Sequence, residues 1–161
     1  MANTATNVLV GTCTITVGST ASGYTTEDGV TITISDDEQE VMVDQSVYAL
    51  KEAISKRGCE IAFTFAEASL VNMALVLPGA TVSPGTVLTL NEPGDTLTPS
   101  TLTLVGKDTA GTARTWLFGS VVPSGGTSYT YGRAKLQQVP AKFKAIKSAT
   151  GTVPLTITDV A

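Results

Sequence analysis

Apolar and polar side chains alternate with a period of two through much of this chain, which is the pattern of β-strands with one buried face. The segment Thr12–Val17 reads Thr-Cys-Thr-Ile-Thr-Val, and Val30, Ile32 and Ile34 alternate with threonine and serine. The pattern predicts strands over residues 12–17, 30–35, 41–43, 87–90, 101–105, 114–122, 139–145 and 155–160. In the segment 139–145, one face is expected to carry Val139, Ala141, Phe143 and Ala145, and the other Lys142 and Lys144.

The longest extended segments run from Val47 to Lys56 and from Cys59 to Phe65, with Arg57-Gly58 between them. Glycine between two strand patterns is a typical turn signal. The two segments are therefore predicted to form a hairpin of long strands with its turn at Arg57-Gly58.

One helix is predicted, from Glu67 to Leu77. Leu70, Met73, Ala74 and Leu77 follow the i, i+3, i+4, i+7 spacing of a helix with one apolar face, which we expect to pack on the core. Glu67 is expected in the first turn, where the helix dipole favours an acid. Pro78-Gly79 is expected to end the helix.

The segment 79–100 is punctuated by Pro-Gly pairs and reads as a long connection rather than a domain boundary. The 161 residues are enough for one domain with a core, so residues 1–161 are predicted to form a single domain. The predicted fold class is mainly β (α+β), a β-sandwich or half-open barrel with one helix on its flank.

Charge is sparse and unevenly placed. Charged residues make up 15 % of the chain and the net charge is −4, which does not suit a protein that grips duplex nucleic acid. Seven of the 14 acids lie between Glu27 and Asp44 with no base among them, and five bases lie between Arg133 and Lys147 with no acid. Segments of opposite sign can pair with each other or line different faces.

The two cysteines, Cys13 and Cys59, lack metal-ligand spacing. The first 17 residues lack the basic start and apolar core of a signal peptide, and no apolar run reaches the roughly 20 residues of a membrane helix. We therefore expect synthesis in a reducing cytoplasm, no membrane association, and both thiols buried as small apolar groups.

The sequence lacks the residue types and motifs that common catalytic sites require. The chain has no histidine, which removes the usual general base and both the Ser–His–Asp and Cys–His arrangements. Nucleotide-binding glycine motifs are also missing. We expect no enzymatic activity and no cofactor.

The acidic cluster around Asp36-Asp37-Glu38 lacks the alternating oxygen ligands and central glycine of a calcium loop. It reads instead as a solvated turn between two strands or as a negatively charged face. Trp116, Phe118, Tyr129 and Tyr131 have few basic neighbours, so they are expected to pack rather than to stack on bases.

Three stretches, in this order, carry a family resemblance. The first is Gly-Tyr-Thr-Thr-Glu-Asp-Gly-Val-Thr-Ile at residues 23–32, followed after an acidic turn by Val-Asp-Gln-Ser at 43–46 and a long strand. The second is Ile-Ala-Phe-Thr-Phe-Ala-Glu-Ala-Ser-Leu at 61–70, running into the helix, and the third is Val-Pro-Ala-Lys-Phe-Lys-Ala-Ile-Lys at 139–147. Together they resemble the tail tube protein (major tail protein) family of long-tailed bacteriophages. The segment 79–100 departs from that pattern.

The resemblance implies a structural virion protein whose subunits form six-membered rings that stack into a hollow tail. It implies a central β-barrel shared among subunits, with the helix outside it, and DNA that passes through without specific binding. It also implies assembly in the host bacterial cytoplasm, and contacts with tape-measure, terminator and baseplate proteins.

Two roles are open for the acidic residues near the long strands. They could face the lumen, where a basic wall would hold DNA, or they could meet the basic segment of a neighbouring subunit. The acids are Asp36, Asp37, Glu38, Glu40, Asp44 and Glu52, and the bases are Arg133, Lys135, Lys142, Lys144 and Lys147.

Two other classes of function remain open. One is a different component on the same fold, such as a tail terminator, baseplate hub or type VI secretion tube. The other is an immunoglobulin-like capsid decoration or adhesion module, which would lack a shared barrel.

Overall fold

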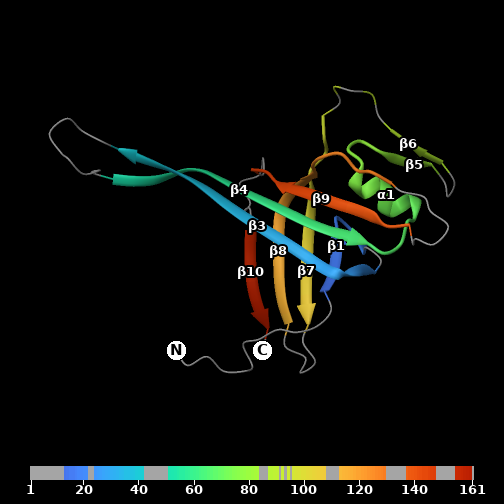
Figure 1. Cartoon of the computed structure of the whole chain (residues 1–161), viewed down its shortest axis with the longest axis horizontal. Helices are drawn as coiled ribbons and strands as arrows, with labels where there is room; N and C mark the ends of the chain where they lie inside the picture. Colours follow the sequence, from blue (N-terminus) through green and yellow to red (C-terminus); the bar gives the residue numbers. More distant parts are fainter. Residues whose placement is uncertain are drawn as a thin grey trace.

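The computed structural model describes residues 13–21, 24–41, 51–83, 87–90, 92, 94, 96–107, 113–129, 137–147 and 155–160. Strands dominate this part of the chain, and one short helix lies at one end (Figure 1). The elements are β1 (Cys13–Val17), β2 (Thr20–Ala21), β3 (Thr25–Val41), β4 (Lys51–Phe65), α1 (Leu70–Val76), β5 (Thr81–Ser83), β6 (Val87–Thr89), β7 (Ser100–Lys107), β8 (Ala113–Pro123), β9 (Val139–Ala145) and β10 (Leu155–Val160).

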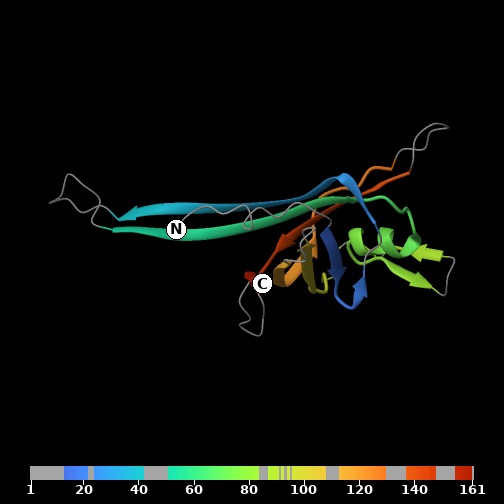
Figure 2. The ribbon, with the colours of Figure 1, turned by 90° about the horizontal axis from the view of Figure 1, so that it is seen from below.

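The long strand β8 divides the main sheet into two layers. The strand order is β2-β1-β7-β8-β9-β4-β3, and β10 also pairs with β8. Residues 113–118 of β8 pair with β10, whereas residues 121–123 pair with β9. The first layer, β3, β4 and β9, therefore folds over the second, made of β2, β1, β7, β8 and β10 (Figures 1 and 2). This half-open, two-layered arrangement confirms the predicted fold class.

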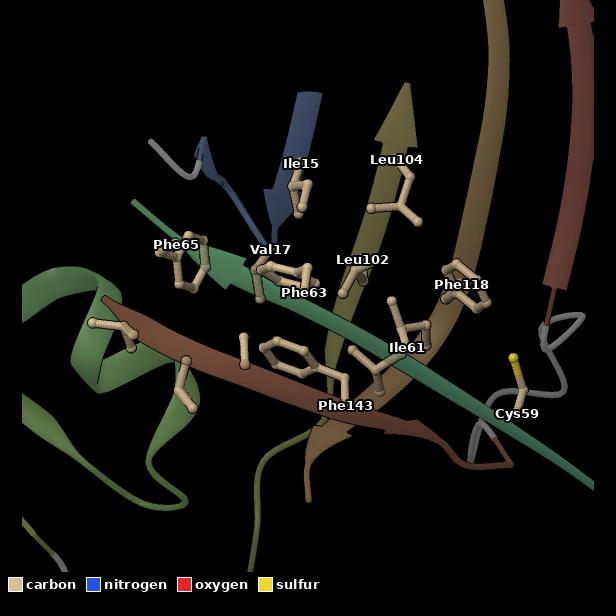
Figure 3. Packing of buried hydrophobic residues seen from close by; sticks show 14 residues of the cluster. Ile15, Val17, Cys59, Ile61, Phe63, Phe65, Leu102, Leu104, Phe118 and Phe143 are labelled. Atoms are coloured by element: carbon tan, nitrogen blue, oxygen red, sulfur yellow. The ribbon is translucent and has the colours of Figure 1, made fainter. Parts of the chain in front are cut away.

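The core fills the space between the layers. Figure 3 shows Ile61, Phe63 and Phe65 of β4 and Phe143 of β9 pointing toward side chains of β1, β7 and β8. The rings of Phe63 and Phe143 stack with centroids 5.8 Å apart. The buried apolar residues are Ile15, Val17, Cys59, Ile61, Phe63, Phe65, Val76, Leu102, Leu104, Phe118, Val121, Val139, Ala141 and Phe143.

Strand β9 follows its sequence pattern closely. Val139, Ala141 and Phe143 are buried and Ala145 is partly buried, whereas Lys142 and Lys144 are exposed on the opposite face. The strand bounds are those predicted, as they are for β10. The predicted strand 12–17 and the region 101–122 are likewise confirmed as β1, β7 and β8, with ends that differ by one or two residues. Trp116 and Phe118 lie in β8 and pack at the core as expected, whereas Tyr129 packs there from outside any strand and Tyr131 lies outside the described residues.

The helix is shorter than predicted. It begins at Leu70 because the Ser69 hydroxyl caps it, accepting a hydrogen bond from the Asn72 backbone N–H at 3.2 Å. Glu67 therefore lies before the first turn rather than in it, and its carbonyl accepts from Asn72 Nδ2 at 3.0 Å. Asn72 and Val76 are its buried residues, and Met73 of the predicted stripe packs, partly buried, against the core as expected. The helix ends with Leu77 as its C-cap, and the expected Pro78-Gly79 pair follows directly, with Gly79 at φ 69°.

The predicted hairpin with a turn at Arg57-Gly58 is wrong. Lys51–Phe65 is one continuous strand, and it pairs along its length with β3, so that Arg57 stands opposite Asp36 and Gly58 opposite Ser35. A Cβ at position 58 would lie 2.8 Å from Ser35 Oγ, so the glycine serves a close approach between strands. Residues 42–50, which connect β3 to β4 and include the first four residues of the predicted strand from Val47, lie outside the described part.

The Pro-Gly-rich segment 79–100 contains a small hairpin of its own. Strand β5 pairs with β6, which confirms the predicted short strand near Val87, whereas β5 was not predicted. This hairpin lies beside α1 at the end of the molecule opposite the long strands (Figure 1).

Both cysteines are free thiols. Cys59 is buried on β4, and burial raises the pKa of its thiol above the ordinary value. Cys13 is half-buried on β1, and burial likewise raises its pKa. Both groups are therefore held in the neutral form expected of small apolar residues.

Replacing Phe143 with alanine should lower the free energy of unfolding by about 3–5 kcal/mol, because the ring is 1 % exposed and joins both layers. Lys144→Ala, at the neighbouring exposed position, should change it by less than about 0.5 kcal/mol. Equilibrium denaturation in urea measures both values. Equal, small losses would contradict this description of the core.

Candidate assembly surface

Strands β3 and β4 continue past the sandwich as a two-stranded ribbon, defined here as residues 34–41 and 51–59. Strand β4 pairs with β9 only from Glu60 to Phe65, and β3 pairs with β4 alone. Among the described residues, the ribbon therefore has no third strand. Figures 1 and 2 show it projecting well beyond the rest of the molecule.

The ribbon and the strand that leads into it leave backbone and apolar groups unmatched. The outer edge of β3 is 17 residues long and pairs with no other described strand. Ile34 and Ile54 on the ribbon are 49 % and 52 % exposed. Two-stranded ribbons are marginally stable in water, and long open edges attract further strands. Among the described residues, these features mark a surface that could accept a further strand.

The two faces of the ribbon carry different side chains. We call the face that continues from Ile61 and Phe63 the core-side face, and its reverse the outer face. Because side chains alternate along β3 and cross-strand partners share a face, the residues sort by register. The core-side face carries Ile34, Asp36, Glu38, Glu40, Ile54, Arg57 and Cys59, and the outer face carries Ser35, Asp37, Gln39, Lys56 and Gly58.

One ion pair links the two strands of the ribbon. Arg57 Nε and Nη2 donate to the two carboxylate oxygens of Asp36 at 2.6 and 2.8 Å. These hydrogen bonds lower the pKa of Asp36 and raise that of Arg57. A bidentate contact of this kind fixes orientation as well as charge, so it holds the ribbon in register.

A β-bulge follows directly. Asp37 pairs with Lys56, but the next residue, Glu38, pairs with Ile54, so Ser55 is the extra residue on β4. A second irregularity lies between Thr25 and Val30 of β3, where Gly29 adopts φ 74°. Bulges increase the local twist and set the direction in which a strand leaves a sheet.

The six predicted acids do not form one surface. Asp36, Glu38 and Glu40 share the core-side face, and Asp37 lies on the outer face. Glu52 stands opposite Glu40 in the register, and Asp44 lies outside the described residues. The expected acidic turn at Asp36-Asp37-Glu38 is wrong, since these residues are in the middle of β3, where Asp36 is held by Arg57.

The predicted basic segment lies partly on β9. Lys142 and Lys144 point away from the core, on the outer face that β9 shares with β4, and Lys147 is exposed just after the strand. Lys142 Nζ lies 3.6 Å from Glu60 Oε2, and Lys144 stands opposite Glu60 in the register. Arg133 and Lys135 are outside the described residues. The structure thus brings two of the bases together with Glu60, an acid that sequence reasoning missed.

Glu60, Arg57 and the two exposed isoleucines were missed for the same reason. Their roles depend on which residues stand across the strand, and the mistaken turn removed those partners. A correct pairing of β3 with β4 would have placed Asp36 beside Arg57, since the opposite charges then face each other.

Neither a metal cluster nor a membrane helix emerges from the part of the chain that the structure covers. No group of three or more histidine, cysteine or acidic side chains within it could hold a metal ion. No helix there is long and apolar enough to cross a membrane. A shallow hollow of about 340 Å³ lies on the outer face of the first layer, bordered by Asp28, Thr64, Ser124 and Lys142 among others.

Comparisons with known proteins reveal a likeness of fold. No protein-family model matches the chain, and no curated protein matches it in sequence. Among solved structures, it is similar to a chain of an extracellular contractile injection system, described as the PVC sheath-tube complex in its extended state and determined by cryo-EM. The TM-score is 0.55 at 15 % identity, over 92 % of this chain and 88 % of that chain. At this identity the likeness shows a shared fold.

Arg57→Gln should raise the pKa of Asp36 toward its ordinary value, because the donors that favour the carboxylate are lost. Because the pKa of Asp36 is lower in the folded than in the unfolded state, the ion pair stabilises the ribbon fully at pH values above the unfolded-state pKa. That contribution is lost as the pH falls through the folded pKa. Carboxyl titration by NMR measures both proteins. An Asp36 pKa that does not respond to the substitution would contradict the ion pair.

Proposed function

We propose that this chain is the structural subunit of a tail-like tube, in which copies join side by side into rings and the rings stack into a hollow cylinder. The observation that carries the proposal is the projecting ribbon, with its unpaired β3 edge and exposed isoleucines. The likeness of fold to a sheath-tube complex and the sequence resemblance to phage tail tube proteins support it. The role is non-enzymatic.

The two layers suggest which side of the subunit faces the bore. A ring that closes through strand edges must use the layer whose edge is long and open, which is the first layer. The second layer, α1 and the β5–β6 hairpin all lie on the core side of that layer. The second layer, α1 and the hairpin occupy more space than the centre of a ring offers, so they lie on the outside of the ring. The outer face of β3, β4 and β9 then lines the conduit.

The same arrangement gives the ribbon a place to bury its core-side face. In a single copy this face continues the core surface beyond the second layer, leaving Ile34 and Ile54 half in water. Contact with a neighbouring copy would bury both, and each fully buried isoleucine contributes on the order of 1.5–3 kcal/mol. Because the contact is between different surfaces of identical subunits, it can repeat into a ring or an open filament.

The acids of the ribbon take separate roles in this arrangement. Asp37, on the outer face, belongs to the conduit wall. Asp36, Glu38 and Glu40 turn toward the neighbour, where Lys147, Arg133 and Lys135 are candidate partners. Glu38 and Glu40 make no ion pair with any described residue of their own chain, which leaves their charge available across the interface.

Six-membered rings, a virion location, assembly in the bacterial cytoplasm, and tape-measure, terminator and baseplate partners follow from the resemblance and belong to the proposal. A second candidate is the tube of a contractile injection system, which the likeness of fold to the PVC sheath-tube complex favours. A terminator on this fold would stop at one ring, whereas a tube subunit forms long cylinders.

Concentrated protein should form long hollow cylinders under negative-stain electron microscopy, and Ile54→Asp should abolish them, because a buried carboxylate without a partner opposes association. Leu117→Asp is the matched control, since Leu117 is 41 % exposed on the face of the second layer that points away from the core, and it lies outside the ribbon. Circular dichroism should show both variants folded. A reference protein that stays monomeric, even when seeded with tail initiator complexes, would contradict the proposal.

Reversing two interface charges together, Glu38→Lys with Glu40→Lys, should shift assembly to at least tenfold higher protein concentration, because lysines would face the basic segment of the neighbour. Light scattering at several protein concentrations measures the threshold. Glu67→Lys with Glu92→Lys makes the same change in net charge on exposed residues away from the ribbon, so its threshold should stay near that of the reference. Equal shifts in the two variants would show a general charge effect instead.

A further inference from the structure

The outer face of the first layer carries its charges in an ordered way. In register, Asp37 stands beside Lys56, then Ser35 beside Gly58, and the next row holds Thr33, Glu60 and Lys144. Thr31, Ala62 and Lys142 form the row after that. These rows hold three lysines and the acids Asp37 and Glu60, and Asp28 of β3 borders the hollow beside Lys142, so bases and acids are balanced on this face.

Glu60 occupies the central position among these charges. Its carboxylate lies 3.6 Å from Lys142 on the diagonal, and Lys144 stands directly across the strand pair, at a spacing where oppositely charged side chains interact. The side chains of Glu60 and Lys142 are 48 % and 55 % exposed. An exposed ion pair adds little to stability, so the fold does not need Glu60.

Unpaired lysines on this face would affect DNA binding rather than the stability of the fold. A lysine that contacts a phosphate releases a condensed counterion, and the favourable terms add over all contacts. Every copy in a stacked tube repeats Lys142 and Lys144, so a duplex inside would meet them at each ring. A wall of this kind would hold the DNA that the tube has to release.

From this we infer that Glu60 is the residue that keeps the conduit from binding duplex DNA, by pairing with Lys142 and by placing a negative charge across the strand pair from Lys144. The inference rests on the proposed tube function and on the outer face as the bore wall. Glu60 acts through the two lysines, so it is a positioning residue for charge and not a contact for DNA itself.

The test assembles tubes from the full chain in the presence of a linear DNA duplex, then digests with nuclease and sediments the tubes. Glu60→Gln tubes should carry nuclease-protected DNA, on the order of tenfold more than the reference at low salt, because Lys142 loses its ion pair and Lys144 loses the negative charge across from it, so both lysines bind phosphate more strongly. Protection should fall steeply as the salt concentration rises, with a log–log slope larger by about 0.9 for each added contact.

Rescue and control variants isolate the charge effect. Glu60→Asp keeps a carboxylate and should return to the low reference level, and adding Lys142→Gln and Lys144→Gln to Glu60→Gln should do the same. Glu67→Gln removes one acid from an exposed site near α1 and should leave protection unchanged. If Glu60→Gln does not assemble, Thr33→Lys adds a base to the same row without touching Glu60 and should also raise protection.

The outcomes separate this inference from the tube itself. Long tubes of Glu60→Gln or Thr33→Lys with no more protected DNA than the reference overturn the inference and leave the proposed function intact. DNA that sediments with the tubes but remains open to nuclease overturns it as well, because the lysines would then face outward. Absence of tubes from the reference protein overturns the proposed function.

Discussion

The structure depends on one constraint, which is that a strand pair longer than the sandwich must leave hydrogen-bonding groups without partners. Strands β3 and β4 satisfy each other, and β9 satisfies part of β4, but the outer edge of β3 has no neighbour in the described chain. A backbone edge cannot be repaired by a change of rotamer or by a local ion pair. The edge of β3 can be hydrogen-bonded by water or by another strand. The exposed Ile34 and Ile54 favour another strand, because a neighbouring chain would also bury these side chains.

The division of the sheet at β8 makes such a long pair possible. Because β8 pairs with β10 at one end and with β9 at the other, the first layer crosses the second and buries Phe63, Phe65 and Phe143 between them. That core anchors one half of the β3–β4 pair firmly, so the other half can project without its own hydrophobic support. The described chain therefore combines a packed body with a projecting strand pair that has no core of its own.

The local pattern of apolar and polar residues was enough to predict those elements whose surroundings are the same along their whole length. Strand β9 alternates because one face meets the core throughout, so its bounds and its buried face could be read directly from Val139 to Ala145. The Arg57-Gly58 pair shows where this fails, since glycine there allows the approach of Ser35 across the strands rather than a turn. An Arg-Gly pair occurs both in turns and inside strands. Only the partner strand shows that Arg57-Gly58 lies inside a strand. The mistaken turn also hid the candidate site. That site depends on cross-strand ion pairs, such as Asp36 with Arg57 and Glu60 with Lys142, which appear only once the strand pairing is known.

The bulge at Ser55 shows how much of the surface chemistry depends on register. In a regular strand, Ile54 and Lys56 would point to the same side, because residues two apart share a face. The extra residue places Ile54 opposite Glu38 and Lys56 opposite Asp37, so the apolar side chain goes to the core-side face and the lysine to the outer face. One face of the ribbon is thereby suited to burial against a neighbour, and the other keeps its acid beside its base. A single inserted residue thus separates the proposed subunit interface from the proposed wall of the conduit.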